Sequence, residues 1–265
     1  MLRTSLAVSL AVSLALILAA PACDNKPKVD PAAQAEELKR DLSNAMARVK
    51  DEKYAEAEAM LARVLAAEPE NALALAGMGR VRLGTKKHPE ALALLERAAQ
   101  KLPDDVSIQA SLGEAYTKLD RPADAATAFA AAFKGEPANG NYGLAQAKAL
   151  HKVKQLDKAE AVLREVAKTD AQTEFVYTEL GDVLREEGKL DDSLKSYMKA
   201  LIEHPGDKSA HAGAAEVYAL RGNNAKAIDE WSTYIRMDCC SEFSNKTAKP
   251  KIAALQAAAA APAAP

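Results

Sequence analysis

The chain has 265 residues, 59 of them alanine and 5% aromatic, and its 35 lysines and arginines nearly balance 37 aspartates and glutamates for a net charge of −2. This excess of the best helix former favours an all-helical protein over a sheet fold. The balanced charge excludes a typical nucleic-acid-binding protein, and a content of 49% hydrophobic and 27% charged residues is that of a folded chain.

Residues 1–22 have the pattern of a targeting segment. Arg3 supplies a positive start, and residues 6–20 form an uncharged apolar run. The run is shorter than the roughly 18 apolar residues that indicate a membrane-spanning helix. One interpretation is an ordinary secretion signal that is cut after Ala22, because Ala20-Pro21-Ala22 fits a small-residue cleavage site.

The second interpretation of this segment is a lipoprotein signal. Residues 18–23 (LAAPAC) resemble a bacterial lipobox, in which the cysteine after the cleavage point carries the lipid. Residues 23–37 are polar and contain prolines, as a tether from a lipidated Cys23 would be. We therefore predict a signal peptide at 1–22, lipidation of Cys23 and attachment to the outer membrane. Asp24 resembles the inner-membrane retention signal of enteric bacteria, which leaves the inner membrane as the alternative.

A period of 34 residues organises the rest of the chain. Four prolines that would end helices are spaced by 34, 34 and 68 residues: Pro69, Pro103, Pro137 and Pro205. We number the positions within a repeat as places 1 to 34 and assign this proline to place 32. The six repeats are then 38–71, 72–105, 106–139, 140–173, 174–207 and 208–241. Places 8 and 20 are small in every repeat, and place 24 is always large and apolar. We expect the small residues to let two antiparallel helices approach closely, with the large residue filling the gap beside them.

These columns resemble the tetratricopeptide repeat family. The third repeat carries Leu112-Gly113, Tyr116, Ala125, Phe129, Ala132 and Pro137 at the family's places. The resemblance implies an all-α solenoid of six helix–turn–helix repeats in a right-handed superhelix. After the last repeat, residues 242–256 predict a short capping helix, and the Ala/Pro-rich residues 257–265 predict a disordered tail.

The resemblance also implies a concave groove lined by places 2, 5, 9 and 12 of each repeat. The polar candidates for binding a partner there are Arg80, Glu114, Lys148, His151, Asp182 and Arg185. The alternative is a solvated face whose charges only pair with one another.

An apolar stripe falls on groove places of the first two repeats. It consists of Leu42, Met46, Val49, Leu73 and Leu83. Exposed apolar patches mark interaction sites, which predicts a docking surface. The alternative is that the first helix rotates by one residue, buries the stripe and exposes Asp41, Asn44 and Arg48, which the repeat pattern places in the interior.

The sequence predicts no catalytic site, no cofactor and no metal site. His151 and His211 lie on separate helices, and the chain has no H-E-x-x-H, G-x-S-x-G or P-loop motif. Cys239 and Cys240 are adjacent, and their Cα atoms, about 3.8 Å apart, are closer than the roughly 4.4–6.8 Å of a relaxed disulfide. They are expected to be partly buried loop thiols or to bond to another chain.

Size, signal and repeat number together resemble the pilotin-type repeat lipoproteins of type IV pili. This resemblance implies a membrane-anchored, periplasm-facing scaffold that captures a secretin subunit in its groove and assists assembly of the outer-membrane pore. The alternatives are a component of the β-barrel assembly machinery, an adaptor for cell-wall enzymes, and an enzyme regulator with no membrane role. In each case the predicted partner is a protein, with no nucleic acid and no small-molecule substrate.

Overall fold

The computed structural model describes residues 30–170 and 173–260. The expected signal peptide and Cys23 lie outside these residues. Within them the chain forms helices and no strand: α1 (Pro31–Lys50), α2 (Tyr54–Ala67), α3 (Ala72–Gly84), α4 (His88–Lys101), α5 (Val106–Lys118), α6 (Pro122–Gly135), α7 (Gly140–Lys152), α8 (Leu156–Thr169), α9 (Val176–Glu186), α10 (Leu190–Glu203), α11 (Lys208–Leu220), α12 (Asn224–Met237), the π-helix η1 (Ser244–Ala248) and α13 (Lys249–Ala260).

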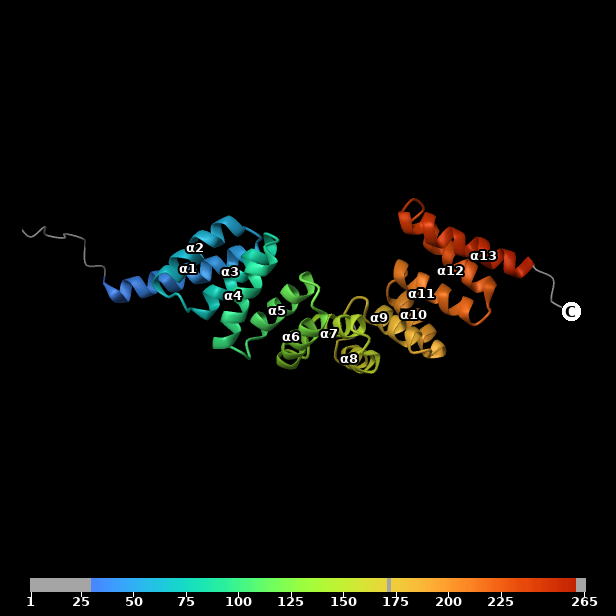
Figure 1. Cartoon of the computed structure of the whole chain (residues 1–265), viewed down its shortest axis with the longest axis horizontal. Helices are drawn as coiled ribbons and strands as arrows, with labels where there is room; N and C mark the ends of the chain where they lie inside the picture. The colour runs from blue at the N-terminus through green and yellow to red at the C-terminus, as the bar shows by residue number, and fades with distance from the viewer. Residues whose placement is uncertain (1–29, 171–172, 261–265) are drawn as a thin grey trace, which may run out of the picture.

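The first twelve helices form six hairpins that follow one another in chain order, from α1 at one end of the molecule to α12 and α13 at the other (Figure 1). Each hairpin packs mainly on its neighbours in sequence. The predicted solenoid of helical repeats is therefore confirmed.

The ends of the helices follow from local chemistry. The second helices α2, α4, α6 and α10 end one residue before Glu68, Leu102, Glu136 and His204, and a proline follows each of these four residues. A residue before proline is disfavoured in the helical region, so the helix ends there. Several first helices then begin with a capping side chain. Asp105 Oδ1, for example, accepts a hydrogen bond from the Ile108 backbone N–H at 2.9 Å.

The small and large columns of the repeat meet as predicted. A Cβ atom added to Gly113 would lie 2.7 Å from the Phe129 ring, and one added to Gly181 would lie 2.6 Å from the Tyr197 ring. Both distances are shorter than real contacts, so glycine is needed for the two helices of these two hairpins to approach this closely.

Place 15 of every repeat adopts the left-handed backbone conformation in the turn between the paired helices. The φ angles are 58° to 62° at Glu52, Lys86 and Lys154, 56° at Asp120, and above 70° at Gly188 and Gly222. Only the fifth and sixth repeats place glycine there, although this conformation favours glycine. The recurrence of one turn geometry explains why the period stays at 34 residues.

Both ends of the solenoid are longer than expected. Residues 31–37, expected as tether, belong to α1, because Asp30 caps the helix and Pro31 suits its first turn. At the other end, η1 and α13 form the cap, and residues 257–260, expected in the disordered tail, are helical. The alanine run there has the highest intrinsic helix propensity. Residues 261–265 lie outside the described part.

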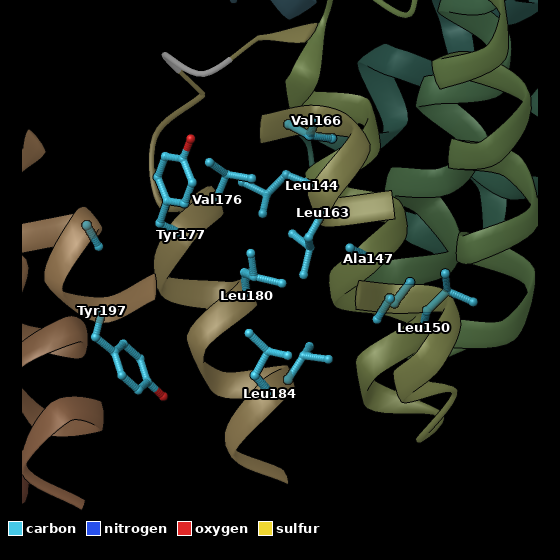
Figure 2. Packing of buried hydrophobic residues seen from close by; sticks show 14 of the residues in the cluster. Leu144, Ala147, Leu150, Leu163, Val166, Val176, Tyr177, Leu180, Leu184 and Tyr197 are labelled. Carbon is cyan, nitrogen blue, oxygen red and sulfur yellow. The ribbon is translucent and has the colours of Figure 1, made fainter. Parts of the chain in front are cut away.

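The buried side chains form clusters along the solenoid rather than one central core. The largest joins repeats three to six, and Figure 2 shows its centre, where Leu163 of α8 lies near Leu180 of α9 and Leu184 follows one turn further along α9. Tyr197 of α10 belongs to the same cluster and is fully buried. No helix in the described ranges is long and apolar enough to cross a membrane.

Candidate protein-binding groove

We call the inner face the surface formed by places 6, 9, 12 and 13 of the first helices together with α13. Side chains on this face join helices that are one repeat apart. Arg185 of α9 pairs with Glu216 of α11 at 2.8 Å, and Glu216 also accepts a hydrogen bond from Lys251 Nζ of α13 at 2.5 Å. These contacts place α9, α11 and α13 next to one another along one face.

A buried tyrosine supports the Arg185 end of this chain of charges. The Tyr197 hydroxyl donates to Asp182 Oδ1 at 2.7 Å, and Arg185 lies 3.4 Å from the same carboxylate oxygen. Burial raises the pKa of Asp182, while the hydrogen bond from Tyr197 and the positive charge of Arg185 oppose that rise. Burial opposes the charge of Arg185, but Tyr197 and the carboxylates around it raise the pKa of Arg185 overall. Arg185 therefore stays charged, with the Tyr197 hydroxyl and the Asp182 and Glu216 carboxylates around it.

His151 of α7 extends the same network toward the middle of the molecule. Its Nδ1 lies 2.7 Å from Glu179 and its Nε2 lies 3.2 Å from Glu186, both on α9. The hydrogen bond with Glu179 raises the pKa of His151, burial lowers it, and Glu186 adds to the rise. Lys154 pairs with Glu186 at 2.7 Å. We call His151, Glu179, Asp182, Arg185, Glu186, Glu216 and Lys251 the paired section of the inner face.

The middle of the inner face is different. A hollow of about 300 Å³ lies between α5, α6 and α7, with Phe129 and Ala149 in its wall and Glu114, Lys118 and Lys148 among its charged residues. Within residues 30–170 and 173–260 these three charged side chains take part in no ion pair, although Lys152 beside them pairs with Asp120 at 2.5 Å. We call the hollow and these three side chains the open section.

The apolar stripe of the first two repeats divides between core and surface. Val49 and Leu83 are only 6% and 8% exposed and lie in buried clusters, which corrects the expectation that they line a groove. Leu42 and Met46 are half-buried, and Leu42 packs against the first cluster. Leu73 remains 42% exposed and Arg80 half-exposed.

Neither interpretation of the first helix describes it fully. Asp41 is buried and receives two hydrogen bonds of 2.8 Å from Arg63 of α2, so an interior place is filled by an ion pair. Those bonds lower the pKa of Asp41, although burial opposes them. Asn44 is exposed and Arg48 pairs with Glu56 at 3.1 Å, as a rotated helix would require. The sequence pattern did not reveal that Asp41 is buried and paired with Arg63.

None of the polar candidates is fully buried, but they do not form one site. His151, Asp182 and Arg185 belong to the paired section, whereas Glu114 and Lys148 belong to the open section. Sequence reasoning missed Glu179, Glu186, Tyr197 and Lys251. The 34-residue period does indicate that Glu216 lies beside Arg185. Glu216 occupies place 9 one repeat after Asp182, so it lies next to the place-12 column that contains Arg185.

Three comparisons bear on these observations. Family models described as tetratricopeptide repeat match residues 48–115 and residues 111–173 and 178–236. No curated protein matches the chain in sequence. Among solved structures, PilF of Pseudomonas aeruginosa is 13% identical with a TM-score of 0.66, and the match covers 85% of this chain and 99% of PilF.

Two further solved structures are similar. PilW, described as a widely conserved type IV pilus biogenesis factor, is 20% identical with a TM-score of 0.65, over 79% of this chain and 97% of PilW. YrrB, described as a repeat protein with an unusual peptide-binding site, is 19% identical with a TM-score of 0.61, over 71% of this chain and 97% of YrrB. At these identities the likeness shows the fold alone.

Proposed function

Because the chain belongs to the tetratricopeptide repeat family, we propose that it is a non-catalytic scaffold that binds a protein segment on its inner face and assists secretin assembly for a type IV pilus. Binding is proposed at the open section. There, Glu114, Lys118 and Lys148 border an apolar hollow and have no ion-pair partner of their own in the described structure. This observation carries the proposal.

The physical reason is the cost of removing charges from existing pairs. A partner that docks on the paired section has to displace hydrogen bonds that Arg185, Glu216 and Lys251 already make with one another. A partner at the open section gains ion pairs and fills the hollow without breaking any of those bonds. The open section is therefore the favourable place to bind.

The likeness to PilF and PilW supports the pilus role. In both cases almost the whole of the known protein aligns with this chain, so the likeness extends over most of the solenoid. The lipobox at residues 18–23 supports lipidation of Cys23 and attachment to the outer membrane with the solenoid facing the periplasm. A tethered solenoid of this kind would hold the bound segment at the membrane where the pore is built.

Affinity capture from detergent-solubilised envelopes tests the proposal. Wild type is compared with Lys118→Glu/Lys148→Glu and with a control of equal charge change, Lys134→Glu/Lys168→Glu on α6 and α8, where both lysines are exposed. We expect wild type and control to recover a secretin and the open-section variant to lose it while circular dichroism shows all three folded.

Other results contradict the proposal in separate ways. Recovery of barrel-assembly or cell-wall proteins in place of a secretin removes the pilus role and supports one of the alternative scaffolds. Equal recovery by the open-section variant and the control means that binding lies elsewhere on the molecule. A Cys23→Ser chain that still sediments with outer membranes contradicts lipid anchoring.

A further inference from the structure

The two remaining cysteines lie in the turn that follows the last hairpin. Cys239 and Cys240 are both exposed and both free, and they occupy the turn between α12 and η1. They are the cysteines of the described residues, and the proposed groove function makes no use of them. The expectation of partly buried thiols is therefore wrong, because both are open to solvent.

The turn is held in place on both sides. Before it, Asp238 accepts hydrogen bonds from the Tyr234 hydroxyl at 3.2 Å and from Lys208 Nζ at 3.4 Å. After it, Ser241 Oγ accepts from the Ser244 backbone N–H at 3.0 Å, and Asn245 Nδ2 donates to the Cys240 carbonyl at 3.4 Å. The thiols are thus presented at a defined point on the end of the solenoid.

Two exposed apolar side chains flank the thiols along the chain. Met237 is 38% exposed and Phe243 is 42% exposed, and both belong to the small group of large hydrophobic residues that the described structure leaves open. The Phe243 ring lies 5.3 Å from the Tyr234 ring and 6.2 Å from the Trp231 ring, so it is fixed against the core on one side. Apolar surface of this kind favours association, because a partner that covers it removes it from water.

We propose that the Cys239–Cys240 turn is a covalent self-association site, at which thiol–disulfide exchange joins this chain to a second copy. The proposal goes beyond the groove function and does not depend on it. A disulfide between adjacent residues is strained, because their Cα atoms are about 3.8 Å apart. In contrast, a second copy related by a two-fold axis places Cys239 opposite Cys240 of the other chain, and the same contact occurs twice.

The chemistry needs a disulfide donor such as oxidised glutathione. The thiolate of one cysteine attacks the donor, its S–S bond breaks, and one thiolate of the donor leaves. A cysteine thiolate of the second copy then attacks the mixed disulfide and releases the other half of the donor. In total two protein thiols lose two protons and two electrons, and one donor disulfide becomes two thiols.

The adjacency of the thiols favours the second copy in this exchange. In a Cys-x-x-Cys pair the second thiol resolves the mixed disulfide within the chain, but here that step would form the strained ring. The contact with Cys239 also raises the pKa of Cys240, which disfavours the Cys240 thiolate. The mixed disulfide therefore persists until a thiolate of another chain reaches it.

The test uses the full chain with Cys23→Ser, so that only the turn carries thiols, and treats it with oxidised glutathione. We expect a covalent dimer on non-reducing electrophoresis, with a mass of two chains less two hydrogens for each bond, which a reductant reverses. Because each bond joins Cys239 of one copy to Cys240 of the other, neither Cys239→Ser nor Cys240→Ser forms the dimer alone. An equimolar mixture of the two variants forms a dimer with one bond, and the double variant forms none. A monomer lighter by two hydrogens, a monomer that only carries glutathione, or no reaction overturns the proposal.

A second comparison tests the apolar patch. Phe243→Ser and Met237→Ser are expected to slow dimer formation about fivefold, because each removes apolar surface that the second copy would cover. Their thiols should react with a small maleimide as fast as in the parent chain. Leu102→Ser, at a residue that is 39% exposed on another repeat, is the matched control. Dimerisation of all three variants at the parent rate overturns the assignment of this surface to a second copy.

Discussion

The paired and open sections of the inner face both use places 9 and 13 of the repeat, yet their charged side chains behave differently. In the paired section Arg185 lies between Asp182 and Glu216, and His151 lies between Glu179 and Glu186. In the open section Glu114 and Lys148 occupy place 9 of neighbouring repeats and still make no ion pair in the described structure. The difference shows that the pairing of a charge in a repeat column depends largely on the helices one repeat away.

Replacing the large side chain at place 24 with alanine should give the largest difference in stability between the two sections. The Tyr197 ring is fully buried between Gly181 and Gly213, and its hydroxyl is a partner of Asp182. Phe129 is half-buried, because one side of its ring borders the hollow. We expect Tyr197→Ala to lower the free energy of unfolding by about 4 kcal/mol and Phe129→Ala by about 2 kcal/mol. Urea denaturation measures both, and a larger loss for Phe129→Ala would contradict the contrast.

Removal of one carboxylate charge should show the same difference at a smaller scale. Glu216 serves both Arg185 and Lys251, and the three side chains are 26% to 42% exposed, so solvent weakens each bond. We expect Glu216→Gln to cost about 1–2 kcal/mol of stability.

Glu114→Gln provides the matched control for Glu216→Gln. It alters an exposed side chain without an ion pair and should change stability by less than about 0.5 kcal/mol. Thermal unfolding followed by circular dichroism distinguishes the two variants, and equal effects would mean that the paired section contributes no net stability.

The paired section should also give stability a dependence on pH. The hydrogen bond with Glu179 raises the pKa of His151 above its value in the unfolded chain. The stabilisation is then complete below the unfolded pKa of about 6.5 and is lost as the pH rises through the higher folded pKa. Urea midpoints of wild type should fall over this window, and those of His151→Gln should fall less. Parallel profiles for the two proteins would show that His151 is not the group responsible.

The smallest expected effect concerns the turns next to the two sections. Gly188 has a φ of 77° with open space around it, so Gly188→Ala costs only backbone strain, about 1 kcal/mol. Asp120 has a φ of 56° in the turn beside the hollow. Asp120→Gly relieves the backbone strain but removes the ion pair with Lys152, so stability should change by less than about 0.5 kcal/mol. Melting temperatures of the two variants measure these effects. A stabilising effect of Gly188→Ala would contradict the role of the left-handed turn.

The sequence predicted the architecture more completely than the site. The proline spacing and the small and large columns indicated six hairpins, and the contacts of Gly113 with Phe129 and of Gly181 with Tyr197 are those that the columns predict. The site was predicted only in part. Sequence periodicity identifies the side chains that share a face, but it does not say which of them form ion pairs. Arg185 and Glu216, for example, are 31 residues apart, which is not a multiple of the 34-residue period.

The sequence by itself determined the period, the helix ends and the close approach of the helices. Each of these depends on contacts within one repeat or on a local backbone preference, so each leaves a mark at a regular spacing. Only the tertiary structure decided that Asp41 is buried with Arg63, that Val49 and Leu83 belong to the core, and that Lys251 of the cap completes the paired section. The physical reason is that these outcomes depend on how far each helix rotates against its neighbours, and that rotation leaves no periodic mark in the sequence.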